Sequence, residues 1–192
     1  MCCPAREKQK AECLRANAEG PALLAELCKK YSVSFLTFSS DLVFDGEKGA
    51  PYVESDKVNP LNTYGLSKAE SEARILEKNS DAIVIRTSSF FGPWDKYNFV
   101  YTTLRSLEEG KPLSVAGDVF VSPTYVPDLV NVSLDLLVDD EKGIWHLANH
   151  GELTWADLAY EVADRFGLNR KYLNATTNEE MNYPAKRPLY SV

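Results

Sequence analysis

Ser40, Tyr64 and Lys68 are the residues whose types and spacing could best support a chemical reaction. Tyr64 and Lys68 are four residues apart in a predicted helix, so their side chains share one face. Ser40 follows a predicted strand over 33–38. Open α/β sheets form their ligand crevices at the carboxyl ends of such strands. Together the three groups could deliver a proton to a carbonyl oxygen.

The energetics of this chemistry are consistent with these residue types. A tyrosine donates a proton near neutral pH only if its pKa falls from about 10 by roughly 3 units, which is ~4 kcal/mol. A lysine ammonium ~4 Å away supplies a similar amount at an effective dielectric constant of ~20. The Ser40 hydroxyl would hold the oxygen that receives the proton. A Tyr-x-x-x-Lys spacing alone also occurs by chance on amphipathic helices, so its position between two buried strands matters.

The elements that must position these residues alternate between helix and strand, which favours an α/β fold with a parallel sheet. Residues that are apolar on both faces indicate buried strands at 33–38 and 82–87. Apolar periodicity predicts helices over 5–30 and 63–79. Further along the chain we expect helices near 98–109, from Pro127 to about 137 and after Thr154, and short strands near 113–115 and 144–148.

Two of these helices have predicted inward faces. In the helix over 5–30 the face consists of Leu14, Ala18, Leu24 and Leu27. In the helix over 63–79 it consists of Leu66, Ala69, Ala73 and Leu76. Both predictions rest only on the helical spacing of apolar residues.

Composition excludes several classes of protein. The chain has 192 residues and a net charge of −7, so no general positive field attracts nucleic acid or anionic lipid. No apolar run approaches the ~20 residues needed to span a bilayer, and the N-terminus has no apolar signal segment. We expect a cytoplasmic protein with neither nucleic acid nor membrane as a partner.

Metal chemistry and histidine-based triads are not expected. The four cysteines all lie in the first 28 residues and include no Cys-x-x-Cys pair. The two histidines, His146 and His150, have no nucleophile motif or spaced carboxylate beside them. His146 lies in an apolar run, which predicts a position in or near the core.

Several segments in order carry a resemblance to a known family. They are SSDLVFDG at 39–46, NPLNTYGLSK at 59–68, IRTS at 85–88, SPT at 122–124, DL at 128–129, HLAN at 146–149 and RP at 187–188. In these segments the chain resembles the extended short-chain dehydrogenases/reductases, nearest to the dTDP-4-dehydrorhamnose reductases and their sugar-nucleotide-binding relatives. The resemblance covers nearly the whole chain and implies a Rossmann-like fold.

The resemblance implies roles in the reduction of a 4-keto sugar nucleotide by NADPH or NADH. Tyr64 would donate the proton, Ser40 would polarise the carbonyl, and Lys68 would tune Tyr64 and hold the nicotinamide ribose. Tyr64 and Lys68 would therefore also be the cofactor-binding residues.

Three other residues receive supporting roles from the same resemblance. Asn17 occupies the helix position of the supporting catalytic asparagine. Asp41 and Arg187 correspond to substrate-binding positions.

The chain also departs from the family pattern. It has no Gly-x-x-Gly-x-x-Gly turn, which in the family places the cofactor pyrophosphate at a helix N-terminus, and the family's first strands are missing. It stops shortly after Arg187, where the family continues into a final helix. Ser88-Ser89-Phe90 replaces the usual Ser-Trp, an aromatic platform for the sugar. We therefore expect the catalytic and substrate-binding portion of a reductase, which binds no cofactor and is inactive alone.

The expected organisation has two parts. Residues 1–92 would be the remnant of the Rossmann-like domain, with Ser40, Tyr64 and Lys68, and residues 93–192 mainly a small substrate-binding α/β lobe with a partial return to the sheet. Without the family's preceding strands, the strand over 33–38 becomes an edge that invites pairing, so we expect a homo-oligomer. The alternative is a non-catalytic sugar-nucleotide-binding or regulatory interaction module.

Overall fold

The computed structural model describes residues 9–190. Its first part alternates helix and strand, as predicted. The elements are helix α2 (Lys10–Leu14), π-helical segment η1 (Arg15–Glu19), helix α3 (Gly20–Lys30), strand β1 (Leu36–Phe38), 3₁₀ turn η2 (Asp41–Val43), helix α4 (Thr63–Lys78) and strand β2 (Ile83–Arg86).

The second part contains more strands than the sequence pattern predicts. The elements are β3 (Phe90–Phe91), α5 (Phe99–Glu108), β4 (Leu113–Ala116), β5 (Phe120–Val121), β6 (Thr124–Tyr125), α6 (Val126–Val138), β7 (Gly143–His146), β8 (Leu153–Thr154), α7 (Trp155–Arg165), η3 (Arg170–Tyr172) and β9 (Leu173–Thr176).

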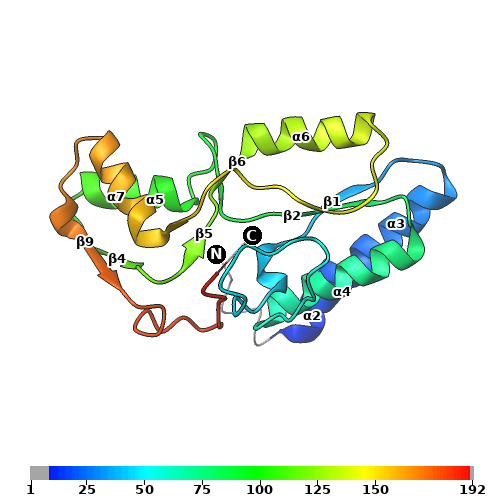
Figure 1. Ribbon diagram of the computed structural model, residues 1–192, viewed down its shortest axis with the longest axis horizontal. Helices are drawn as coiled ribbons and strands as arrows, with labels where there is room; N and C mark the ends of the chain where they lie inside the picture. The colour runs from blue at the N-terminus through cyan, green and yellow to red at the C-terminus, as the bar shows by residue number, and fades with distance from the viewer. Residues whose placement is uncertain (1–8, 191–192) are drawn as a thin grey trace.

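A three-stranded parallel sheet in the order β1-β2-β7 forms the centre of the larger body. Helices α3 and α4 cover one face and α6 covers the other (Figure 1). On the first face Val84 packs with Ala25 and Ile75. On the second, Ile83 and Ile85 pack with apolar residues of α6. The predicted α/β class with a parallel sheet is confirmed.

A smaller α/β body lies beside this sheet, at the left of Figure 1. It consists of the parallel pair β4–β9 with α5 and α7 packed on it. Its core contains Leu107, Val115, Ala159 and Leu173. The chain returns from β4 and β5 to the large sheet through α6 and β7. The division of the chain at residue 92 stays a prediction.

The predicted inward faces of the helices over 5–30 and 63–79 are partly wrong. In α3 the small residues Ala22 and Ala25 are buried, whereas Leu24 and Leu27 are 55% and 40% exposed. Alanines on the inner face allow α3 and α4 to approach closely, and this leaves the leucines on the outside. In α4, Ala73 is exposed, and the buried face includes the polar residues Ser67, Ser71 and Glu72.

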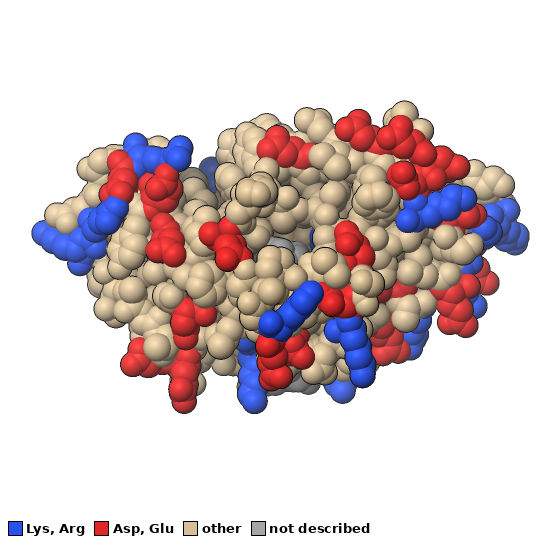
Figure 2. Space-filling model, in the orientation of Figure 1, with Lys and Arg blue, Asp and Glu red and all other residues tan. Residues whose placement is uncertain are grey.

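The distribution of charged side chains on the surface is consistent with the net charge of −7. On the face shown in Figure 2, basic side chains lie among acidic ones. Within residues 9–190, no helix is long and apolar enough to cross a membrane, and no group of three or more His, Cys, Asp and Glu is placed to hold a metal ion. Cys13 is buried and Cys28 is half-buried, and Cys2 and Cys3 lie outside the described residues.

Candidate active site

The start of α4 is capped by Asn62 and packs closely against η2 at Gly65. The Asn62 side chain accepts a hydrogen bond from the Gly65 N–H at 2.8 Å and donates one to the Lys186 carbonyl at 2.8 Å. A Cβ on Gly65 would lie 2.0 Å from the carbonyl oxygen of Leu42 in η2. Only glycine therefore permits α4 to begin this close to η2, which directly follows Ser40.

Tyr64 and Lys68 lie together on the first two turns of α4. The Lys68 ammonium is 5.9 Å from the centroid of the Tyr64 ring. The same ammonium donates a hydrogen bond to the carbonyl of Phe38 at 2.9 Å, and Phe38 is the last residue of β1. The structure thus brings the predicted Tyr–Lys pair to the strand end that carries Ser40.

Ser40 and Asp41 form a hydrogen-bonded group at this strand end. The Ser40 hydroxyl donates to Asp41 Oδ1 at 2.8 Å and accepts from the Leu42 N–H at 3.2 Å. Ser88, from the segment after β2, donates to Asp41 Oδ2 at 2.9 Å. Because a hydroxyl has one proton to donate, Ser40 must turn from Asp41 to bond a substrate oxygen. No role for Ser88 was predicted from the IRTS segment that contains it.

Asn17 lies behind α4 in the π-helical segment η1. Its amide donates to Ser67 Oγ at 3.0 Å, and Ser67 in turn donates to the Tyr64 carbonyl at 2.7 Å. Single-turn π segments are frequent at functional sites. Asn17 is therefore linked through Ser67 to the backbone carbonyl of Tyr64, and its supporting role stays a prediction.

Arg187 lies in the C-terminal segment that adjoins the start of α4. Its guanidinium carbon is 4.3 Å from the centroid of the Tyr183 ring. Its Nε atom is buried and has no hydrogen-bond partner among the described residues, whereas the residue as a whole is half-buried. The preceding carbonyl, that of Lys186, is the acceptor that anchors the segment to Asn62.

A buried ion pair between Glu72 and Arg86 was missed by the sequence analysis. Arg86 Nε and Nη2 donate to the two Glu72 oxygens at 3.0 and 2.7 Å, and the side chains are 3% and 5% exposed. Ser39, next to Ser40, also donates its hydroxyl to Glu72. The sequence does contain one signal for this ion pair, which is an arginine at the end of an apolar strand. A buried charged side chain is almost always paired, so this arginine predicts an acidic partner.

His146 joins the loop between η2 and α4 to the sheet. Its Nδ1 is 3.2 Å from the Tyr52 carbonyl, and its Nε2 is 3.3 Å from Arg86 Nη1. The hydrogen-bond pattern assigns a neutral ring, with Nδ1–H donating and Nε2 accepting. Burial lowers the pKa of His146 below its ordinary value of 6.5; Glu54 opposes this shift and Arg86 adds to it. The half-buried position agrees with the apolar run around His146.

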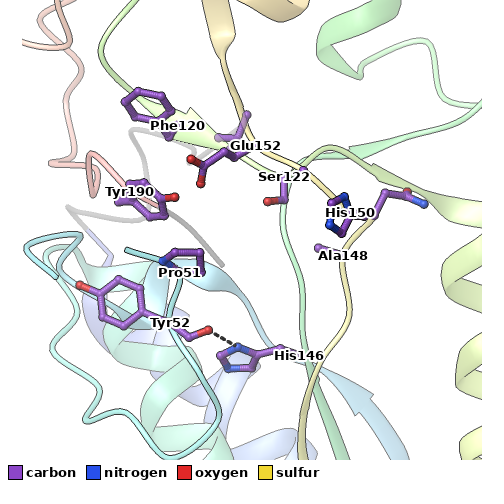
Figure 3. A pocket seen from close by; sticks show the side chains of 12 residues that line it. Pro51, Tyr52, Phe120, Ser122, His146, Ala148, His150, Glu152 and Tyr190 are labelled. Atoms are coloured by element: carbon purple, nitrogen blue, oxygen red, sulfur yellow. Dashed lines mark hydrogen bonds between the residues drawn. The ribbon is translucent and has the colours of Figure 1, made fainter. Parts of the chain in front are cut away.

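A cavity of about 470 Å³ is lined in part by His146 and lies between the loop at Tyr52, strand β5 and the segment after β7. Figure 3 shows the hydroxyl oxygens of Ser122 and Tyr190 and the carboxylate of Glu152 around it, with His146 at one end. Its lining among the described residues includes neither lysine nor arginine, and none of the predicted catalytic residues. These residues provide no cation for a diphosphate group.

Comparison with known proteins places this arrangement in a family. The family described as "RmlD substrate binding domain" matches residues 4–192. The dTDP-4-dehydrorhamnose reductase of Aggregatibacter actinomycetemcomitans is 34% identical over 91% of this chain and 63% of its own length. The spore coat polysaccharide biosynthesis protein SpsK of Bacillus subtilis is 33% identical over 97% of this chain and 65% of its own length.

Solved structures give the same result. A dTDP-4-dehydrorhamnose reductase from Clostridium acetobutylicum has a TM-score of 0.94 and 33% identity, over all of this chain and 68% of that one. The reductase from Bacillus anthracis, solved in complex with NADP, has a TM-score of 0.91 and 29% identity, over 96% and 65%. The chain spans about two thirds of the length of these relatives. The resemblance read from the sequence is thus confirmed, and the chain belongs to the RmlD substrate binding domain family.

Proposed function

We propose that this chain is the sugar-nucleotide-binding and catalytic portion of an NAD(P)H-dependent 4-keto sugar nucleotide reductase. The observation that carries the proposal is the Lys68 ammonium, which lies beside the Tyr64 ring and bonds the last carbonyl of β1. A phenol and an ammonium at the carboxyl end of a parallel strand are suited to protonating a carbonyl oxygen.

The residues divide the chemistry between them. The Tyr64 hydroxyl gives its proton to the 4-keto oxygen, and the positive charge of Lys68 stabilises the phenolate that is left. Ser40 turns its hydroxyl from Asp41 towards the same oxygen. A nicotinamide dinucleotide, when bound, supplies the hydride for the carbonyl carbon. Its ribose end would be held by Lys68, whose ammonium bonds the last carbonyl of β1, and by Tyr64 beside it.

The remaining parts of the substrate have candidate partners. The guanidinium of the half-buried Arg187 would bind the diphosphate, and Asp41 would accept a sugar hydroxyl. Phe90 is 46% exposed and lies edge-on to Phe38, with ring centroids 6.5 Å apart. It would supply the apolar platform for the sugar ring in place of the family's tryptophan.

The chain alone is proposed to be inactive. Its sequence has no Gly-x-x-Gly-x-x-Gly turn, so it provides no phosphate cradle for the dinucleotide. We expect no detectable NADPH oxidation when the purified chain is mixed with a dTDP-4-keto sugar. Robust turnover would show that the cofactor-binding half is dispensable.

Ligand binding tests the proposal directly on the chain. Saturation-transfer NMR with dTDP-, UDP- and GDP-sugars should give signals from at least one of them. These signals should be lost in Arg187→Gln and kept in Arg165→Gln, which removes an exposed guanidinium of α7. No saturation transfer to any of the three would count against sugar-nucleotide binding.

A second candidate function is a non-catalytic binding or regulatory module. The hydrogen bond from Ser40 to Asp41 favours it, because in this arrangement the hydroxyl proton is not directed at a substrate. This second function would be supported if the chain binds a sugar nucleotide but no protein that supplies the dinucleotide-binding half shows turnover.

Self-association is also proposed. Within the described residues β1 pairs only with β2, and Tyr31 and Val33, in the segment that leads into β1, are more than half exposed. An open strand edge beside apolar side chains favours pairing with a second copy. Light scattering at high concentration should detect a dimer or a larger assembly, and a clean monomer would contradict this. The cytoplasmic location stays a prediction.

A further inference from the structure

We propose that Glu72 and Arg86 are positioning residues: their buried ion pair fixes the distance between the Tyr64–Lys68 pair and the strand end that carries Ser40. The inference rests on the proposed function, because it assigns these two residues to that same site. Neither is expected to touch the substrate.

The first observation is the order of contacts along α4. Tyr64, Lys68 and Glu72 are spaced by four residues, so they form one stripe on the helix. Lys68 bonds the carbonyl of Phe38, and one turn later Glu72 accepts the hydroxyl of Ser39. Two consecutive turns of the helix therefore hold two consecutive residues of the strand end. Ser40 is the next residue, so its place relative to Tyr64 follows from these two contacts.

The second observation is how Arg86 holds Glu72. Its guanidinium makes two parallel hydrogen bonds to the carboxylate, a geometry that fixes rotation as well as distance. The guanidinium carbon lies 5.0 Å from the Phe44 ring centroid, and Nη1 donates to the Glu54 carbonyl at 3.3 Å. The Glu72 carboxylate thus has little freedom to move away from Ser39.

The third argument is energetic. Burying two charges costs several kcal/mol of desolvation, and apolar residues of similar size are often as stabilising or more so. Stability alone therefore does not require this ion pair. What it supplies is a directional link between α4, β1 and β2. Catalysis needs such precision, because a misplacement of ~1 Å can cost about 100-fold in rate.

The test measures the ionisation of Tyr64, which depends on its distance from Lys68. The chain is labelled with [¹³Cζ]tyrosine and titrated by NMR, and the variant Tyr64→Phe assigns the signal. The double variant Glu72→Leu/Arg86→Met removes the link and leaves no buried charge unpaired. Ser39→Ala removes only the hydroxyl contact and decides the question if the double variant does not fold. Glu70→Gln is the matched control, because Glu70 lies on the same helix in a partly exposed pair with Arg74.

We expect the Tyr64 midpoint to rise by about one pH unit in the double variant, and in the same direction in Ser39→Ala, as the charge of Lys68 moves away. Glu70→Gln should leave it unchanged. If the Tyr64 midpoint is unchanged in the folded double variant or in Ser39→Ala, the positioning role is overturned and the proposed function is left intact. A wild-type midpoint near that of an ordinary tyrosine, with no rise in Lys68→Met, overturns the proposed acid chemistry and the positioning role with it.

Discussion

Replacing Gly65 by alanine should damage the site without removing any catalytic group. Gly65 lies in the first turn of α4, directly after Tyr64, and its backbone faces Leu42 in η2. A Cβ there would lie 2.0 Å from the Leu42 carbonyl oxygen and 3.0 Å from its carbonyl carbon and from Pro60 Cβ. The first of these partners is a backbone atom, so it cannot turn away as a flexible side chain could.

The size of the effect follows from that distance. Real Cβ atoms almost never approach other heavy atoms closer than 3.0 Å, so α4 and η2 must separate by at least 1.0 Å. Overpacking of this kind costs about 1–3 kcal/mol. Helix propensity acts in the opposite direction, because alanine is favoured over glycine by about 1 kcal/mol. The upper end of the overpacking cost therefore leaves a net loss of ~2 kcal/mol. Such a loss lowers Tm by roughly 4–8 °C in a protein of this size.

Calorimetry or a thermal melt followed by circular dichroism would measure the change. The matched control is Gly20→Ala, also in a helix, where the added Cβ would have one neighbour, the Arg15 carbonyl oxygen at 3.7 Å. This control should keep or slightly raise Tm. If Gly65→Ala melts at or above the wild-type temperature, the close approach of α4 to η2 does not constrain the site. Tyr64 would then not owe its position to this contact.

Three further predictions concern catalysis and pH. In a protein that supplies the dinucleotide-binding half, Tyr64→Phe should lower kcat for reduction at least ~100-fold, and an effect under threefold would remove Tyr64 from the chemistry. Burial lowers the pKa of His146, so the unfolded chain binds the extra proton more readily and stability should decline as pH falls through 6.5. Denaturant titrations at pH 8 and pH 5.5 would measure that decline, which should be smaller in His146→Asn. Several hydrogen bonds, of which the one from Tyr52 is the largest, lower the pKa of Asp45 to about 2. The Asp45 carboxylate therefore stabilises the fold above its unfolded pKa, and this stabilisation is lost as pH falls towards 2. Tyr52→Phe should raise the Asp45 pKa towards 3.8, visible in carboxyl ¹³C NMR, and an unmoved titration would contradict the assignment.

The local features of the fold could be predicted because they depend on neighbours in sequence. The spacing of Tyr64 and Lys68 puts them on one face of any helix, and the apolar runs at 33–38 and 82–87 both contain parallel strands. Burial was predicted correctly for the strand at 83–86 but not for the one at 36–38, where Leu36 and Thr37 are half-buried and Phe38 is exposed, because β1 lies at the edge of the sheet. The helix expected after Thr154 is also present, and it begins with a capping box formed by Thr154 and Asp157. Strand β9, by contrast, lies in a polar tail whose own pattern gives no sign of pairing with β4.

The sequence alone determined the alternation of helices and strands and the placement of Tyr64 and Lys68 one helical turn apart, since helical periodicity and the reach of a side chain over one turn are local properties. Only the tertiary structure decided which groups surround them. Ser88 bonds Asp41 across 47 residues, and Arg86 contacts His146 across 60. Such pairs form because buried polar groups must find partners wherever the packed chain supplies them, and no local pattern specifies where that is.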